Sequence, residues 1–115
     1  MKFNKNDIYI LSEIHNNGLV KRNIIKENLM SDFYNDTITD KKANRIIVRS
    51  AGKLAQSGCI KILPDFQEDD YGYIDVRRNI YKITDKGSSV AHEIINGEYD
   101  EYYINWIYLW SKKIC

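Results

Sequence analysis

Residues 39–64 read TDKKANRIIVRSAGKLAQSGCIKILP, and within them a helical period gives way to a strand period. Thr39 and Asp40 are favourable residues for capping a helix, so the stretch predicts a helix over residues 41–57 that Gly58 closes. The next five residues have strand propensity, and Pro64 is expected to end that strand. The segment therefore predicts a helix that runs directly into a β-hairpin.

Two more helices are expected before this segment. Apolar side chains at helical spacing predict a helix over residues 6–17, which Asn6 or Asp7 can cap and Gly18 stops. A shorter helix is predicted over residues 21–30, and a rather long loop joins it to the helix that starts near residue 41.

The second strand of the hairpin is expected where polar and apolar residues alternate, over residues 78–84. Residues 64–77 are polar and acidic, so they predict a long hairpin tip. Thr84 or Asp85 caps a further short helix, and a last helical pattern occupies residues 98–113. The expected order is three helices, a two-stranded hairpin and two helices, which is an α+β fold that is mainly helical.

One face of the predicted helix over residues 41–57 is cationic. On a helical wheel this face carries Lys41, Lys42, Arg45, Arg49 and Lys53. The opposite face is small and apolar. Like charges four residues apart cost an isolated helix a few tenths of a kcal/mol per pair, so the stripe predicts acidic neighbours from elsewhere or a polyanionic ligand. In duplex DNA, arginine can pair with guanine, lysine with phosphates and Asn44 with adenine. A solvated helix face is the plainer alternative.

Two motifs flank the hairpin in a familiar order. The segment from Leu54 to Ile60, LAQSGCI, resembles the LxxxGxI ending of recognition helices in MarR-, ArsR- and PadR-like winged-helix proteins. The segment from Arg78 to Gly87, RNIYKITDKG, resembles their returning wing strand, R-x-x-Y-x-[LI]-T-x-x-G. The resemblance implies a winged helix-turn-helix domain over residues 1–97, with three helices and a two-stranded wing. The hairpin tip is longer and more acidic than the usual wing.

Proteins of this superfamily are mostly transcriptional repressors or activators, so the resemblance implies a sequence-specific protein that binds double-stranded DNA as a homodimer. Some small members from plasmids and phages, such as the TubR adaptors, instead bind repeated sites with a partner protein for DNA partition, or assist at a transfer origin. A winged helix that has lost DNA binding and contacts partner proteins is a third possibility.

The hairpin supplies a second candidate contact surface. Lys61, Arg77 and Arg78 lie on or near its strands, and the resemblance implies that such residues reach flanking phosphates or the minor groove. The acidic residues of the tip, from Asp65 to Asp70, argue against contact between the extreme tip and DNA, because carboxylates repel phosphates. Alternatively, the two arginines only neutralise this acidic loop.

The C-terminal segment, residues 98–115, which contains the last helical pattern, is unusually aromatic. Its broad apolar face carries Tyr99, Tyr102, Tyr103, Trp106, Leu109 and Trp110. Because large exposed aromatic patches are rare on monomers, the face predicts a dimer interface. The alternative is that these side chains fold back into the core of their own chain.

Several function classes are disfavoured by composition. The chain has 115 residues, a net charge of +1 and 43% apolar residues, which suits one small domain. No stretch approaches the roughly 20 apolar residues that cross a bilayer. No phosphate-binding glycine loop, nucleophile motif, metal-ligand spacing or cofactor motif occurs, so neither an enzyme nor a cofactor or metal is expected. The two cysteines, Cys59 and Cys115, are expected to be free thiols in the cytoplasm.

Overall fold

The structure, a computed structural model, describes residues 3–68 and 70–95. Its elements follow the order α1 (Lys5–Asn17), β1 (Leu19–Lys21), α2 (Arg22–Asn28), η1 (Leu29–Phe33), α3 (Asp40–Gln56), β2 (Ile60–Glu68), β3 (Ile74–Ile83) and α4 (Asp85–Ile95). The three strands form one antiparallel sheet in the order β1-β3-β2. The predicted α+β class, mainly helical, is confirmed.

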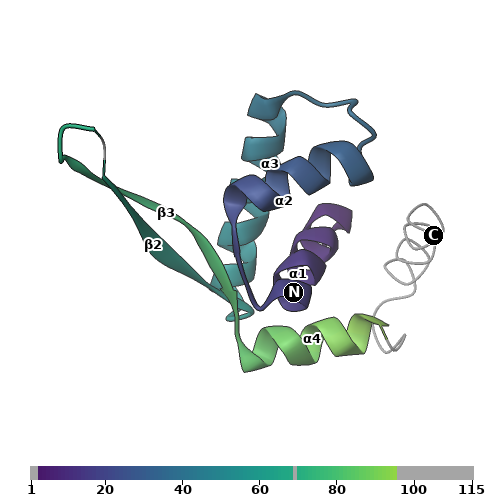
Figure 1. Ribbon diagram of the computed structural model, residues 1–115. Coiled ribbons are helices and arrows are strands. Elements are labelled where there is room, and N and C mark those ends of the chain that lie inside the picture. The colour runs from purple at the N-terminus through teal and green to yellow at the C-terminus, as the bar shows by residue number, and fades with distance from the viewer. Residues whose placement is uncertain (1–2, 69, 96–115) are drawn as a thin grey trace.

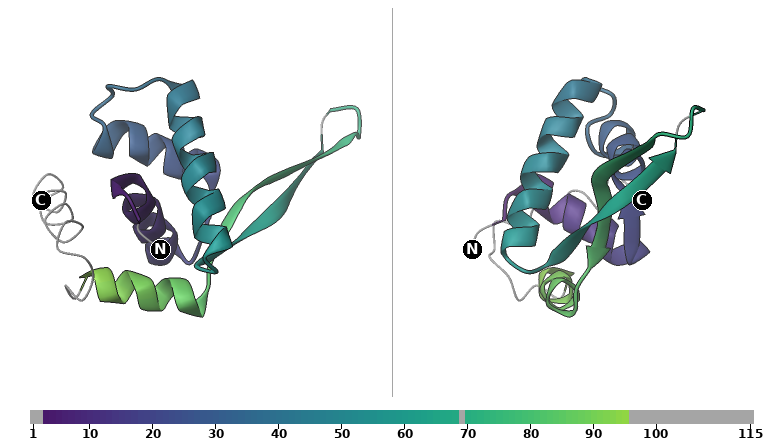
Figure 2. Two further views of the ribbon diagram at one scale, coloured as in Figure 1. Left: turned by 180° about the vertical axis from the view of Figure 1, so that it is seen from behind. Right: turned by 90° about the vertical axis from the view of Figure 1, so that its left-hand side faces the viewer.

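The helices gather into one body, and the hairpin of β2 and β3 extends away from it (Figure 1). Seen from behind, α3 runs along the height of this body, and the hairpin leaves from the lower end of α3 (Figure 2). The predicted aromatic helix and its dimer interface, residues 98–115, lie outside the described residues.

The start of α1 differs from the prediction. The helix is capped by Asn4 rather than by Asn6 or Asp7, because Asn4 and Asp7 form a reciprocal capping box. The Asn4 side-chain oxygen accepts a hydrogen bond from the Asp7 backbone N–H at 2.9 Å, and the Asp7 carboxylate accepts one from the Asn4 N–H at 2.9 Å. Gly18 ends the helix with a φ of 74°, as expected.

A short strand and an irregular turn were not predicted. Leu19, Val20 and Lys21 form β1, and Val20 pairs with Tyr81 of β3. Three residues are too few to show the alternation of a strand, so the sequence alone does not reveal β1. After α2 the chain makes the π-helical turn η1, which covers the end of the predicted second helix and the start of the expected loop.

The N-terminus of α3 is the one the sequence predicts, since the Thr39 hydroxyl accepts a hydrogen bond from the Lys42 N–H at 3.2 Å. Every third or fourth residue of this helix faces the core. Its fully buried apolar residues are Ala43, Ile47, Ala51 and Leu54. They pack against the buried apolar side chains of α1. One face of α3 is therefore buried in the core, and the opposite face is exposed to solvent.

The hairpin strands are longer than predicted. Pro64 does not end the first strand; β2 continues to Glu68, and the register shifts between Leu63 and Asp65. Proline is tolerated there because β2 is an edge strand and the bulge removes the need for its N–H. Most of the stretch expected to form a long tip is therefore paired strand, and the chain reverses between β2 and β3.

The start of α4 sits tightly on the turn between α3 and β2. The Thr84 hydroxyl accepts a hydrogen bond from the Gly87 N–H at 3.0 Å, which confirms the predicted cap. The same hydroxyl donates to the Gly58 carbonyl at 2.6 Å, and the Thr84 N–H donates to the Cys59 carbonyl at 3.1 Å. The motif that ends in Gly87 thus ties the returning strand to the end of α3.

Candidate nucleic-acid interface

The outer face of α3 carries four exposed cations, Lys41, Lys42, Arg45 and Arg49. Ion pairs among the described residues join Lys21 to Asp65, Lys26 to Asp40 and Lys53 to Asp7. None of the four α3 cations belongs to one of these pairs. No described carboxylate neutralises these four cations, so they repel one another. An anionic ligand bound on this face would reduce that repulsion.

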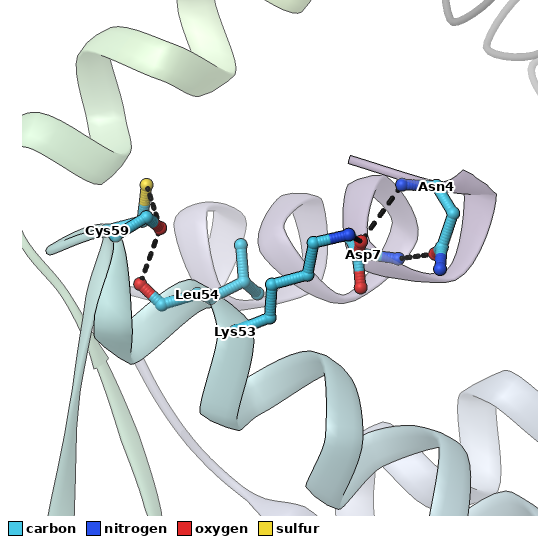
Figure 3. A network of polar contacts seen from close by, with 6 residues as sticks. Asn4, Asp7, Lys53, Leu54 and Cys59 are labelled. Atoms are coloured by element: carbon cyan, nitrogen blue, oxygen red, sulfur yellow. Dashed lines mark hydrogen bonds and ion pairs between the residues drawn. The ribbon is translucent and has the colours of Figure 1, made fainter. Parts of the chain in front are cut away.

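Lys53 has a different place from the other four. Its ammonium lies 2.7 Å from a carboxylate oxygen of Asp7, whose side chain is only 2% exposed (Figure 3). The ammonium is also 5.9 Å from the ring centre of Phe3. Lys53 therefore links the last turns of α3 to the first turn of α1. The free cationic stripe is one turn shorter than the sequence predicts.

One open hollow lies on the α3 surface itself. Its volume is about 590 Å³, and it is lined by Lys41, Asn44, Arg45, Val48 and Arg49. Asn44 is half-buried, whereas Val48 is 52% exposed. Sequence reasoning missed Val48. The hollow presents an apolar side chain and an amide between cations, which is the mixture that base edges in the major groove can contact.

A second hollow lies between the start of α1 and the middle of α3. It has a volume of about 230 Å³, and it is lined by Asn4, Asn6, Lys42, Arg45, Ile46, Arg49 and Ser50. Arg45 and Arg49 line both hollows. The two asparagines were not predicted as site residues, because only the fold brings the start of α1 beside α3.

On the hairpin, Lys61 is exposed and pairs in register with Lys82, which is also exposed. Arg77 pairs through its backbone with Asp65, and Arg78 follows it on β3; the side chains of both arginines lie outside what the structure describes. Two cations side by side on an antiparallel ladder repel each other, so this pair also suits an anionic neighbour.

The acidic tip is smaller than the sequence suggests. Asp65 is 8% exposed and its carboxylate lies 3.5 Å from the Lys21 ammonium, so it belongs to the base of the sheet. Glu68 and Asp70 are exposed. Large exposed side chains lie beside them at the reversal, namely Phe66, Tyr71, Tyr73 and Ile74.

Comparison with protein-family models, curated proteins and solved structures finds no match to this chain. The function is therefore inferred from the geometry of its own residues.

Other chemistry is sparse in the part of the chain that the structure describes. No group of three or more histidine, cysteine, aspartate or glutamate side chains there could hold a metal ion. His15 and His92 pack edge to face with ring centres 5.1 Å apart.

Burial raises the pKa of the Tyr81 phenol above its usual value, so this side chain stays neutral. None of the described helices has the length and apolar character needed to cross a membrane.

Proposed function

We propose that the chain is a winged helix-turn-helix protein that binds double-stranded DNA through α3 and acts as a transcriptional regulator. The observation that carries the proposal is the set of four exposed α3 cations, Lys41, Lys42, Arg45 and Arg49, which no described carboxylate pairs with. The opposite face of the same helix is buried in the core. A helix held in this way presents its cations as a rigid row, which suits the regular spacing of phosphates and bases.

The order of the elements supports the same proposal. Three helices precede a hairpin, and its returning strand β3 pairs with the short strand between the first two helices, which is the arrangement expected of a winged helix. A helix of 17 residues is about 25 Å long, enough to lie in a major groove about 12 Å wide. The hairpin, with Lys61 and Lys82, starts where α3 ends and is the natural second contact with the DNA backbone.

The proposed protein is a homodimer, joined through the aromatic residues predicted for 98–115. Two copies related by a two-fold axis present two α3 helices to successive major grooves, about 34 Å apart. Such a dimer prefers an inverted repeat.

Selection of bound duplexes from a random pool, followed by fluorescence titration of the selected site, tests the proposal. We expect an enriched sequence. Contact with about five phosphates would make the logarithm of the binding constant fall with the logarithm of salt concentration at a slope of about −4 to −5. A single inverted repeat would point to regulation, and an array of direct repeats to partition. No enriched sequence and only weak binding lost at moderate salt would contradict the proposal and favour a protein-interaction module.

Val48 predicts a preference for thymine within that site. An exposed apolar side chain between Asn44 and the arginines can pack on the 5-methyl group of thymine, while the amide pairs with adenine. Burying one methyl group contributes about 0.8 kcal/mol. Replacing the contacted thymine with uracil should therefore weaken binding about three- to fivefold.

The matched control for this contact is Val48→Ala. Alanine is a better helix former than valine, so the variant is expected to fold. It should bind the thymine and uracil duplexes equally. If the variant and the wild-type protein lose the same affinity on uracil substitution, Val48 does not contact the methyl group.

A further inference from the structure

The second hollow, between the start of α1 and the middle of α3, has a chemistry of its own. Asn4 and Asn6 line one side of it, and Lys42, Arg45 and Arg49 line the other. These two groups of residues are far apart in the sequence, and only the packing of α1 against α3 brings them together. No carboxylate is among the residues that line it.

Hydrogen bonds elsewhere fix the two amides so that their donors remain available. The Asn4 side-chain oxygen already accepts from the Asp7 backbone N–H at 2.9 Å. The Asn6 side-chain oxygen accepts from the Tyr34 hydroxyl at 2.7 Å. Each oxygen is therefore engaged, and neither NH₂ group donates a hydrogen bond to another described residue. Each asparagine contributes two N–H donors without a protein acceptor.

The remaining wall adds more donors. Lys42, Arg45 and Arg49 are exposed cations outside the ion pairs of the described residues. Ser50 is only 3% exposed, lines the hollow, and forms no hydrogen bond through its hydroxyl with another described residue. Its hydroxyl is therefore able to donate a hydrogen bond to a ligand oxygen in the hollow.

We propose that this hollow is an oxyanion site that binds one phosphodiester group of the DNA backbone beside the groove that α3 enters. The inference rests on the proposed function and assigns a second role to the α3 cations. A phosphodiester offers acceptor oxygens and one negative charge, which complements a hollow whose polar lining consists of hydrogen-bond donors and three cations without a carboxylate. Guanidinium groups pair with phosphate oxygens in a bidentate manner, and the amides complete the shell.

The site gives the row made by Arg45 and Arg49 two different neighbours. One side of the row made by Arg45 and Arg49 faces the hollow with Asn44 and Val48, where base edges fit. The other side faces the amides of α1, where a phosphate fits. A phosphate held on this side fixes the depth and register of α3 in the groove without reading sequence.

Asn6→Asp tests the site with the smallest change in shape. The aspartate keeps an oxygen that accepts from Tyr34, but it replaces the NH₂ donor with a second carboxylate oxygen and adds a negative charge. An acidic residue in the first turn of a helix is favourable, so the fold should be retained, and thermal unfolding checks this. We expect affinity to fall about tenfold or more for specific and random duplexes alike, with a salt slope smaller by about one.

Asn16→Asp is the matched control. Asn16 is an exposed residue near the opposite end of α1, so this variant makes the same change in net charge away from the hollow. It should keep its affinity to within about twofold, because exposed charges farther apart than about 10 Å are largely screened at 0.1 M salt.

The two hypotheses fail in different ways. Normal wild-type binding combined with full affinity of Asn6→Asp, or equal losses in both variants, would overturn the oxyanion site and leave the proposed function intact. If the wild-type protein binds no duplex, the proposed function fails and the site no longer has DNA as its ligand. A titration with inorganic phosphate then decides the site. Saturable NMR shifts of the Asn4 and Asn6 NH₂ groups in the wild type, with a much smaller shift of the Asn4 NH₂ group in Asn6→Asp, would support it, and unchanged wild-type signals would overturn it.

Discussion

Gly87→Ala is expected to lower the free energy of unfolding by about 2–3 kcal/mol, although alanine is the better helix former by about 1 kcal/mol. Gly87 lies in the first turn of α4, against the turn between α3 and β2. A Cβ atom built on Gly87 would collide with the carbonyl oxygen of Cys59. It would also lie 2.9 Å from the Cys59 carbonyl carbon and 2.8 Å from the Cδ1 atom of Ile83.

The closest contact of the added methyl group is with a backbone atom, so a change of rotamer at Ile83 cannot relieve the collision. The Cys59 carbonyl is held in place because it accepts a hydrogen bond from the Thr84 N–H at 3.1 Å, and the Thr84 hydroxyl, shared with the Gly58 carbonyl, lies 2.9 Å from it. Moving it would disturb both the cap of α4 and the junction of the returning strand. The cost of this strain therefore exceeds the gain in helix propensity.

Gly52→Ala is the matched control, since it makes the same substitution in another helix. No atom lies within 4 Å of a Cβ added at Gly52, so this variant should gain about 0.5–1 kcal/mol from helix propensity alone. Urea unfolding followed by circular dichroism compares the two variants. A Gly87→Ala midpoint equal to or above that of Gly52→Ala would show that α4 does not approach the Cys59 carbonyl so closely.

The elements that the sequence predicts correctly are those with local signals. Thr39 caps α3 through an atom three residues away, and Gly18 ends α1 through its own backbone conformation. The spacing of apolar residues in α3 also predicts which face of the helix is buried, because helical periodicity is a property of neighbouring residues. These features do not depend on which other segment packs against the helix.

The features that were missed depend on segments distant in the sequence. Lys53 lies on the cationic side of the helical wheel, but its partner Asp7 is 46 residues away, and no local pattern joins them. Pro64 is a strand terminator by propensity, and only the position of β2 at the sheet edge makes it acceptable within the strand. Tertiary context overrides the local preference in both cases.

The candidate site was predicted in part. The helical wheel correctly places Lys41, Lys42, Arg45 and Arg49 together on the exposed face of α3. The rotation of 100° per residue along an α-helix is sufficient for this prediction. The same wheel could have found Val48, because seven residues make almost two turns and place it nearly in line with Lys41. Asn4 and Asn6 could not be found in this way, since their place beside α3 follows from the packing of α1.

Arg45→Ala and Arg49→Ala are each expected to weaken specific DNA binding by about 1–3 kcal/mol, or roughly 5- to 150-fold. Both guanidinium groups line the hollow proposed to contact bases and the proposed oxyanion site, so we expect each removal to cost contacts of two kinds. The double variant should lose more than either single variant but less than the sum, because the two residues share their neighbours. Both residues are exposed and alanine favours the helix, so unfolding midpoints should stay within error of the wild type.

Lys86→Ala is the comparison that separates contact from net charge. Lys86 is an exposed cation in α4, so the variant loses the same single charge from another helix. Fluorescence titrations of the selected duplex and of a random duplex should show a near-normal affinity for Lys86→Ala and a reduced ratio of specific to random affinity for each arginine variant. A fall of both affinities by the same factor would mean that the arginine contacts phosphates alone. Full affinity in both arginine variants would remove α3 as the DNA-binding surface, since these two side chains line both of its hollows.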